Sequence, residues 1–374
     1  MPEVPAHEKV FVSAEYMNDS NHGGDKCVDC HGGDPLAAAR AGAHLAMTPR
    51  PTYTGTNGLC SGCHVAVADS FGSSLHNNLA GIRNSVALRA GVNELTGELE
   101  TAFNNHCAKC HTGCGDCHVA VPSAAGGGLL KGHQFKKTPN MTLVCTACHG
   151  SRVADEFKGQ NEGIAPDVHY NRGMQCVECH SGAELHGVAT SPVAHRYDVD
   201  SAPDCADCHP DDAAFTAFTA HSMHRDTEGQ MELSCQVCHS VPYKNCSSCH
   251  VSLSPEGAPI YEVNGPSFES EMTFKIGYNT KRDALHPAKW VPVRHVPIDP
   301  NNYDHYGLDL LPDFDSQPTW RLATPHNIQR ITPQNEGCMS TCHGQRALFL
   351  GPDDLAPYEV DANSMVVVPD ANLP

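Results

Sequence analysis

Every cysteine in this 374-residue chain lies in a short motif that ends in histidine. Nine motifs read Cys-x-x-Cys-His, and a tenth, Cys338-Met-Ser-Thr-Cys342-His343, has one extra residue between its cysteines. Ten motifs account for all 20 cysteines. Each motif supplies two thiols for thioether bonds to a haem and one imidazole for its iron. The pattern therefore predicts about ten covalently attached c-type haems.

The predicted attachment residues are pairs of cysteines, in chain order Cys27 and Cys30, Cys60 and Cys63, Cys107 and Cys110, Cys114 and Cys117, Cys145 and Cys148, Cys176 and Cys179, Cys205 and Cys208, Cys235 and Cys238, Cys246 and Cys249, and Cys338 and Cys342. The predicted proximal iron ligands are the histidines that follow, His31, His64, His111, His118, His149, His180, His209, His239, His250 and His343.

Two other uses of these cysteines are weaker. A disulfide framework does not need a histidine after the second cysteine. A zinc site would pair two CxxC units and leave that histidine incidental. At the tenth motif the extra residue must bulge outward, and nine haems plus a thiol pair is the alternative there.

Fifteen further histidines could bind the opposite faces of the irons. We expect distal ligands at His22, His44, His76, His106, His133, His169, His186, His195, His295 and His326, with His221 and His224 competing for one role. His7, His286 and His305 are weaker candidates. A methionine such as Met47, Met174 or Met223 could replace a histidine, although packing is the commoner role of Met.

Three of these histidines follow a motif histidine at a regular interval. His44, His76 and His221 lie 13, 12 and 12 residues after His31, His64 and His209. The intervening sequences are rich in Ala, Leu and Phe and predict short helices. Because twelve helical residues rise about 18 Å, the second histidine cannot reach the iron of its own motif. It is expected to bind another haem, which would join the haems into a row.

The chain has about 37 residues for each motif, so the haems would form most of the core. We expect a mainly α fold with extensive loops and little β structure, its haems in a closely packed row. Residues 1–250 should hold nine haems, and residues 251–374 should wrap them and carry the tenth. The Pro-rich stretch at 289–300 should be extended and loop-like. The tail at 344–374 is an edge strand or an arm onto a neighbour.

The formal charge of −19 makes nucleic acid an improbable partner, since phosphate binding needs a basic face. No apolar run is long enough for a membrane span. Residues 1–10 lack the apolar core of a signal peptide, and haem attachment to CxxCH occurs outside the cytoplasm, so we expect a removed export signal and a periplasmic or extracellular protein. Five Asp in 299–315 could bind Ca²⁺, but a solvated loop is the stronger interpretation.

These features resemble the multihaem c-type cytochromes of respiratory and extracellular electron transfer. The resemblance covers Cys27 to His343 and rests on the ten motifs, the opening CVDCHGGDP, and the DVHYNRGMQCVECH stretch around His169. The motif–helix–histidine spacing at His64 and His76 is also similar to octahaem hydroxylamine oxidoreductase-like and tetrathionate reductase-like proteins. The resemblance implies closely packed haems and, in some members, one catalytic haem.

Two functions follow as hypotheses. The first is an electron conduit of about ten haems, mostly or all bis-histidine, which passes electrons between redox proteins or to extracellular acceptors, as a soluble shuttle, homo-oligomer or filament. The second is an oxidoreductase that acts on a small nitrogen or sulfur compound at one five-coordinate haem. No motif replaces its histidine with lysine, as some multihaem nitrite reductases do. We therefore predict no catalytic residue.

Overall fold

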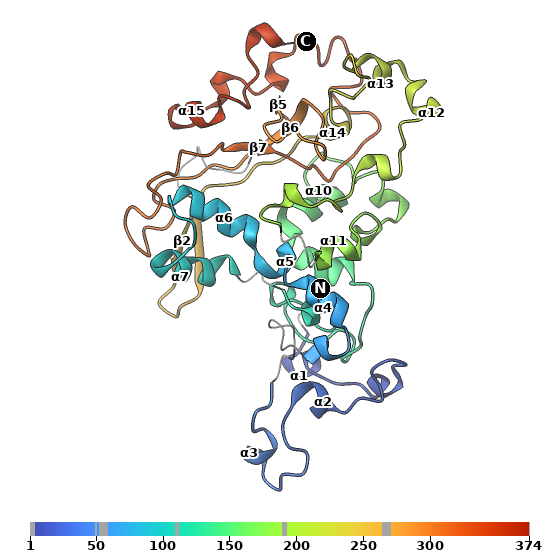
Figure 1. The fold of residues 1–374 in the computed structure, drawn as a ribbon, viewed down its shortest axis with the longest axis vertical. Coiled ribbons are helices and arrows are strands. Elements are labelled where there is room, and N and C mark those ends of the chain that lie inside the picture. Colours follow the sequence, from blue (N-terminus) through green and yellow to red (C-terminus); the bar gives the residue numbers. More distant parts are fainter. Residues whose placement is uncertain are drawn as a thin grey trace. The chain divides into compact units, whose positions relative to one another are not determined.

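Short helical turns joined by long irregular segments dominate the structure (Figure 1). It is a computed structural model that describes residues 4–48, 51, 59–108, 112–188, 193–263 and 271–373. Helix accounts for 37% of the chain and strand for 10%, which confirms the prediction of a mainly helical, loop-rich fold. The 32 Gly and 27 Pro explain the brevity of the elements, because both residues interrupt helices and strands.

The chain divides into two units, each built from separate stretches of sequence. Unit 1 contains residues 1–80, 110–150 and 175–201, and unit 2 contains residues 81–109, 151–174 and 202–374. This division differs from the predicted boundary at residue 250, because two stretches of the first 201 residues belong to the same unit as the C-terminal part. Spacing of motifs along a chain carries no information on such interleaving.

Unit 1 consists of short helices and loops. Its α-helices are α1 (Ala6–Lys9), α2 (Cys27–His31), α3 (Arg40–Ala43), α4 (Val65–Phe71), α5 (Leu75–Asn78), α8 (Cys114–His118), α9 (Thr146–Cys148) and α11 (Gly182–His186). The stretches after His31 and His64 are helical in part, as predicted, at α3 and at α4 with α5. In unit 1, α4 packs against α11, where the Ser73 and Ser74 hydroxyls donate to the carbonyls of Val188 and Leu185 at 2.9 and 2.7 Å.

Unit 2 holds the longer helices and the strands. Its helices are α6 (Ala80–Arg89, which begins at the last residue of unit 1), α7 (Gly97–His106), α10 (Asp155–Lys158), α12 (Ala213–Thr216), α13 (Thr219–Met223), α14 (Cys235–His239) and α15 (Val360–Asn363). Its strands are β1 (Tyr243–Lys244), β2 (Cys249–Leu253), β3 (Pro259–Val263), β4 (Met272–Thr273), β5 (Ile276–Tyr278), β6 (Trp290–His295) and β7 (Trp320–Leu322).

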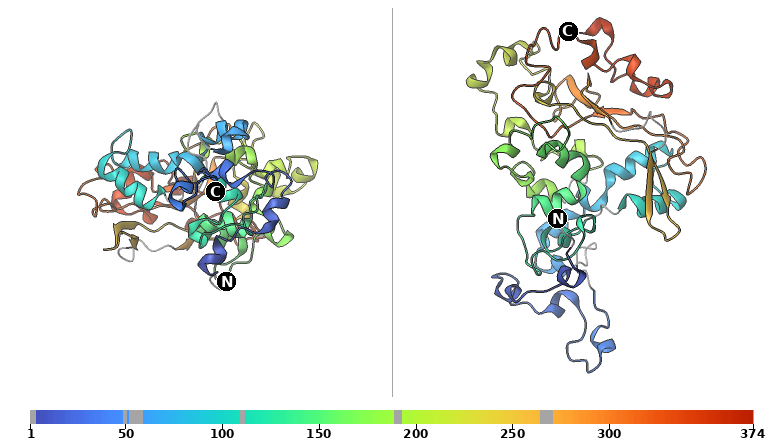
Figure 2. Two further views of the ribbon diagram at one scale, coloured as in Figure 1. Left: turned by 90° about the horizontal axis from the view of Figure 1, so that it is seen from below. Right: turned by 180° about the vertical axis from the view of Figure 1, so that it is seen from behind.

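Three small antiparallel sheets form in unit 2. β1 pairs with β4, β2 pairs with β3 as a hairpin, and β6 lies between β5 and β7. Figure 2 shows the hairpin beside α7, where the Tyr261 hydroxyl donates to the carbonyl of His106 at 3.0 Å.

The Pro-rich stretch at 289–300 is extended, as predicted, but its first half is a central strand rather than a loop. Pro292 lacks an N–H, yet its carbonyl accepts from the Ala323 amide of the neighbouring segment at 2.9 Å. Val291 and Val293 are buried within β6. The burial of this apolar strand outweighs the missing donor.

The main apolar core of unit 2 lies on this sheet. Tyr243, Ile276, Trp290, Phe349 and Val368 pack together in it. The C-terminal tail contributes Val368, which is fully buried, and Val366, whose carbonyl accepts from the Tyr278 amide of β5 at 2.9 Å. The tail therefore packs on its own unit, beside β5.

Candidate haem-binding sites

Most of the cysteine motifs form a single helical turn. Three of them coincide with α2, α8 and α14, and three begin the 3₁₀ turns η2 (Leu59–Gly62), η8 (Cys176–Glu178) and η10 (Cys205–Asp207). The fifth motif spans the end of the π-helical segment η5 (Met141–Cys145) and α9. Residues three apart share one face of a helix, so a turn directs both thiols to the same side.

The ninth and tenth motifs depart from this geometry. Cys249 and His250 begin strand β2. In the tenth motif the Cys342 amide donates to the Cys338 carbonyl at 2.9 Å, and Cys338 takes a positive φ of 40°. The extra residue is thereby absorbed in one turn, with Met339 exposed.

Among the described residues, seven pairs of histidine rings have nearly the same distance between ring centres, and each pair lies within one unit. Each pair joins a motif histidine to a histidine outside the motifs: His64 with His22 (ring centres 6.2 Å apart), His31 with His133 (6.0 Å), His149 with His76 (6.2 Å), His118 with His186 (6.1 Å), His209 with His169 (6.1 Å), His239 with His221 (6.3 Å) and His343 with His224 (6.0 Å). The last pair includes His343 of the tenth motif, which has the extra residue.

These distances fit two imidazoles on opposite sides of one iron. With metal–nitrogen bonds of about 2 Å, the centres of two such rings lie about 6 Å apart. Rings in direct edge or face contact can be closer, as for His22 and Phe135 at 4.0 Å. Seven separations between 6.0 and 6.3 Å therefore leave room for a metal atom between each pair of rings.

Hydrogen bonds orient several of these rings. Nδ1 of His31, His118 and His239 lies 2.9, 2.6 and 3.1 Å from a backbone carbonyl. Nδ1 of His221 and His224 likewise contacts the carbonyls of Phe215 and Ala220 at 3.0 and 2.7 Å. A protonated Nδ1 donating to a carbonyl leaves the lone pair on Nε2, the atom that would bind iron.

Carboxylates orient the rings of two further histidines through Nδ1. Nδ1 of His169 lies 3.1 Å from Asp167, a buried side chain that also accepts from the His169 amide. Nδ1 of His180 lies 2.9 Å from Glu184, and this hydrogen bond raises the pKa of His180. Sequence reasoning missed Asp167 and Glu184, although each lies within four residues of its histidine.

Thiols of different motifs also lie close together in unit 1. The second cysteines Cys30 and Cys63 interact electrostatically, as do Cys117 and Cys148, while hydrogen bonds join the first cysteines Cys60 with Cys114 and Cys145 with Cys176. In the last two pairs a thiol–thiol hydrogen bond raises the pKa of one partner, Cys60 or Cys176. The contacts order five motifs as one, two, four, five and six, alternating between second and first cysteines.

Unit 2 continues the same pattern for three motifs. Cys205 hydrogen bonds with Cys235, both first cysteines. The second cysteines Cys238 and Cys342 interact electrostatically. Burial raises the pKa of Cys238 to about 12, and the neighbouring Cys342 and Cys338 contribute to this increase. Motifs seven, eight and ten are thus adjacent in that order.

The structure assigns separate surroundings to His221 and His224, which were expected to compete for one role. His221 lies opposite His239 of the eighth motif, and His224 lies opposite His343 of the tenth. His221 lies within α13 and His224 directly follows the end of this helix, and each faces a different motif histidine.

Two predicted distal ligands have other partners. Nε2 of His106 lies 2.8 Å from the Tyr306 hydroxyl. Nε2 of His295 lies 2.7 Å from a Glu359 carboxylate oxygen, and the ring stacks on Trp320. In both residues Nε2 has another partner in this structure, and their role as iron ligands stays a prediction.

The remaining predicted ligands have varied surroundings. His44 is exposed and ends α3, and the Tyr197 amide lies 3.4 Å from Nδ1 of His195. The backbone amide of His326 donates to Glu156 at 2.9 Å. Cys110 and His111 of the third motif lie outside the described residues.

The weaker candidates have local contacts of other kinds. His7 lies 3.8 Å from Glu8, His286 lies 3.1 Å from Asp283, and His305 packs edge-on against Tyr306.

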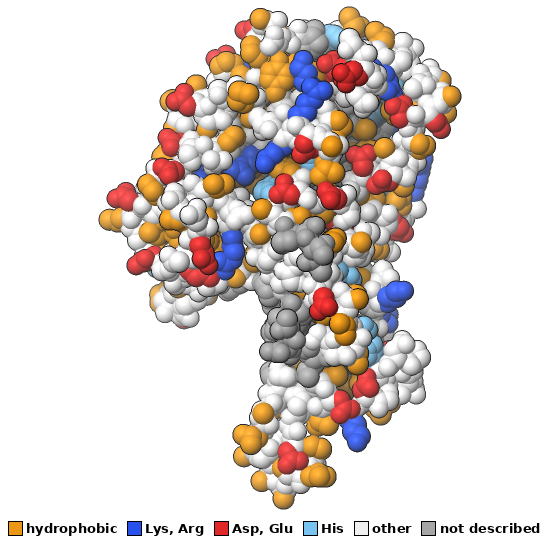
Figure 3. Space-filling model, in the orientation of Figure 1, with side chains coloured by type: hydrophobic (Ala, Val, Ile, Leu, Met, Phe, Trp, Pro, Cys, Tyr) orange, Lys and Arg blue, Asp and Glu red, His pale blue; other side chains and the backbone are white. Residues whose placement is uncertain are grey.

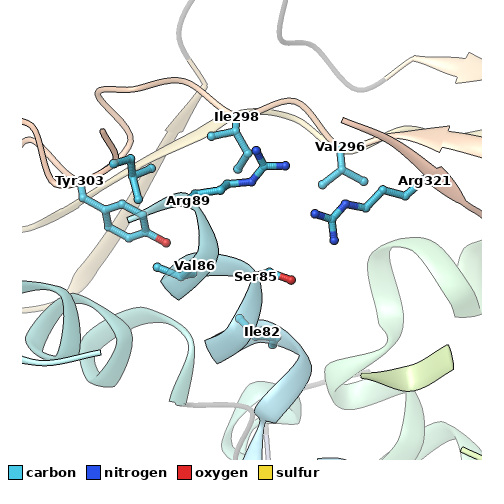
Figure 4. A pocket seen from close by; sticks show the side chains of 9 residues that line it. Ile82, Ser85, Val86, Arg89, Val296, Ile298, Tyr303 and Arg321 are labelled. Carbon is cyan, nitrogen blue, oxygen red and sulfur yellow. The ribbon is translucent and has the colours of Figure 1, made fainter. Parts of the chain in front are cut away.

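A pocket of about 200 Å³ in unit 2 is lined by apolar side chains and two arginines (Figure 4). The guanidinium of Arg89 donates to the carbonyls of Gln317 and Pro318, both at 3.3 Å. Burial and the neighbouring Arg321 lower the pKa of Arg89 to about 10. Tyr303 also lines the pocket, where burial and then Cys107 of the third motif raise its pKa. The pocket has room for a small molecule beside these two arginines.

Within the described part of the chain, no group of three or more His, Cys, Asp or Glu side chains could hold a bare metal ion, the Asp-rich loop at 299–315 included. None of the described cysteines is in a disulfide. No helix in the described residues is long and apolar enough to cross a membrane.

Comparisons with known proteins give no relative for this chain. No protein-family model, no curated protein and no solved structure matches it. Its function is therefore argued from its own residues.

Proposed function

We propose that this chain is an exported multihaem c-type cytochrome that carries electrons through about ten haems. The observation that supports this most strongly is the set of seven histidine pairs with ring centres 6.0 to 6.3 Å apart. Each contains one motif histidine and one outside histidine, as bis-histidine ligation of a c-type haem requires. A disulfide or zinc protein has no reason to arrange its histidines in this way.

The chain's own residues would fix and orient each haem. Two cysteines anchor it covalently, the motif histidine binds one face of the iron, and a histidine from another segment binds the other. When bound, such haems exchange single electrons without binding substrate. Backbone carbonyls and carboxylates at Nδ1 hold the imidazoles in place and tune their basicity.

The thiol contacts support short distances between successive haems. Cysteines of neighbouring motifs hydrogen bond or interact electrostatically, and each cysteine would be bonded to the edge of its own porphyrin. Neighbouring porphyrin edges would therefore approach closely along the orders one–two–four–five–six and seven–eight–ten. Contacts of this kind suit a conduit rather than a set of isolated haems.

Haem content tests this proposal directly. The chain should be produced behind an export signal in a host with a c-type haem attachment system, and its intact mass, haem stain after denaturing electrophoresis and iron content measured. We expect ten haems per chain that survive denaturation. A protein that binds zinc or forms disulfides, with no covalent haem, would contradict the proposal.

One observation favours a second function. The cationic, apolar pocket near Tyr303 has room for a small anion such as nitrite. An oxidoreductase would need such a pocket beside a five-coordinate haem. Titration of the oxidised protein with nitrite or cyanide tests this: a perturbed high-spin signal of about one haem per chain would favour the enzyme, and an unchanged spectrum would favour the conduit.

A further inference from the structure

Two histidines of the proposed haem sites bond through Nδ1 to a carboxylate rather than to a backbone carbonyl. Nδ1 of His180, the histidine of the sixth motif, lies 2.9 Å from a Glu184 oxygen. Nδ1 of His169, which lies opposite His209 of the seventh motif, is 3.1 Å from an Asp167 oxygen. We propose that the two carboxylates make the haems of these motifs, haems six and seven, harder to reduce than haems whose histidines bond to carbonyls. The proposal rests on the proposed function, because it requires haems at both motifs.

Haems one, four, eight and ten provide the comparison within the same chain. Nδ1 of their ligands bonds to uncharged backbone carbonyls, at His31, His118, His239, His221 and His224. A carboxylate attracts the Nδ1 proton more strongly than a carbonyl does, which makes Nε2 a stronger electron donor. Stronger donation and the nearby negative charge both stabilise ferric iron over ferrous iron, so the reduction potential falls.

The carboxylate of Asp167 is held in place beside His169. Its side chain is 2% exposed, and it also accepts from the backbone amides of His169 and Ile328 at 2.6 and 2.5 Å. These contacts fix the carboxylate at Nδ1, and the exclusion of water strengthens its effect on the imidazole.

Glu184 is positioned by the helix that follows the sixth motif. It lies in the first turn of α11, where its amide donates to the Ser181 hydroxyl oxygen at 3.2 Å. Its two carboxylate oxygens lie 3.0 and 2.9 Å from Nδ1 of His180, and its side chain is 16% exposed. Its charge also interacts electrostatically with His76, which lies opposite His149 of the fifth motif. The hydrogen bond thus acts on haem six, while the charge alone reaches haem five.

A negative charge near a haem does not by itself make such a contact. An Asp19 oxygen lies 3.5 Å from Nδ1 of His22, which is too long for a strong hydrogen bond. Acidic side chains are also spread over the face shown in Figure 3, in keeping with the net charge of −19. Charge at the surface therefore acts on many haems, whereas the two hydrogen bonds single out two of them.

The two haems occupy equivalent places in the orders given by the thiol contacts. Motif six is at the end of the order in unit 1, and motif seven is at the start of the order in unit 2. A low potential there would keep electrons on the other haems of each row until the electron donor is more strongly reducing. Glu184 and Asp167 would thus control when an electron reaches one end of each row.

A redox titration followed by visible absorption tests the proposal in the haem-loaded protein, with haem content measured for each variant. For the wild type we expect about two of the haems to be reduced last, as a separate step at low potential. Glu184→Gln and Asp167→Asn should each move about one haem out of this step to higher potential, and the double variant should abolish the step.

Two control substitutions remove a carboxylate beside the same haems whose hydrogen bond goes to a backbone amide. Glu178 lies within the sixth motif, and Asp204 directly precedes the seventh. Glu178→Gln and Asp204→Asn should retain the low-potential step. Because Asp167 accepts from several backbone amides, Asp167→Asn is compared only with its full haem content, and Glu184→Gln decides the case for haem six on its own.

Three results would overturn the proposal. The wild type could lack the low-potential step, or Glu184→Gln could leave it unchanged. Glu178→Gln could also move the step as far as Glu184→Gln does, which would assign the potential to charge alone. Each result is obtained with all ten haems attached, so it differs from failure of the proposed function, in which covalent haem itself is missing.

Discussion

At the residue scale, seven described motif histidines face a histidine from another segment of the chain. The motif cysteines and histidines are evident from spacing alone. The structure places His221 and His224 opposite different motif histidines, and it gives Nε2 of His106 and of His295 other partners. Pairing depends on contacts between distant segments, such as His22 with His64 or His76 with His149, which no local pattern encodes.

A distal ligand can be tested singly at His221. His221→Ala removes the imidazole opposite His239, so about one haem in ten should change from low-spin to high-spin. Electron paramagnetic resonance of the oxidised protein measures this fraction. The control His305→Ala removes a histidine that packs on Tyr306, and it should leave all haems low-spin. Equal spectra for both variants would exclude His221 as a ligand.

The tenth motif can be tested by its covalent haem. His343 lies 6.0 Å from His224, and the turn at Cys338 absorbs the additional residue. Replacement of both Cys338 and Cys342 by Ser should lower the intact mass by one haem and leave the other nine attached. If the mass difference equals the two substitutions alone, the motif with the extra residue carries no haem.

At the element scale, periodicity and composition predict short helices after the motifs, and these are found at α3, α4, α5, α12 and α13. The strand β6 was expected to be a loop because Pro normally weakens a central strand. The carbonyl of Pro292 still accepts a hydrogen bond. The burial of Val291 and Val293 depends on the segments that pack on them, which the sequence does not reveal. In the tail, the burial of Val366 and Val368 likewise depends on the segments that pack on them.

A buried ion pair stabilises the join between α10 and β6. Arg294 donates to Glu156, which also accepts from the His326 amide, and both charged side chains are buried. Glu156→Ala leaves the guanidinium buried without its carboxylate and should lower the free energy of unfolding by about 3–5 kcal/mol. Urea denaturation measures the change.

The matched comparison is the pair between Arg225 and the more exposed Asp211. Asp211→Ala should leave the free energy of unfolding nearly unchanged, because water screens this pair. Equal effects of the two substitutions would contradict the role given to Glu156.

The pair between α6 and α7 should respond to pH. Arg83 donates to Glu100 at 2.8 Å, and this hydrogen bond lowers the pKa of Glu100. A carboxyl whose pKa is lower in the folded state stabilises above its unfolded pKa, and the contribution is lost as pH falls through the folded value. Glu100→Gln should cost about 0.5 kcal/mol at neutral pH, allowing for solvent screening, and nothing in strong acid. A difference from the wild type that grows on acidification would contradict this.

At the scale of the whole molecule, the predicted haem number explains how a chain with few aromatic residues can fold. Aromatic residues are only 6% of the chain, and the main apolar core among the described residues belongs to unit 2. Ten haems would supply the apolar surface that the side chains do not. The composition predicts that haems replace apolar side chains in the core. It does not predict the interleaved units, because these depend on contacts between distant segments.

The central claim is that ten covalently bound haems are held between pairs of histidines. Its most direct test is low-temperature electron paramagnetic resonance of the fully oxidised protein, with iron counted per chain. We predict ten irons and only low-spin ferric signals. A high-spin signal of about one haem per chain that responds to nitrite or cyanide would contradict the account and identify a substrate-binding haem.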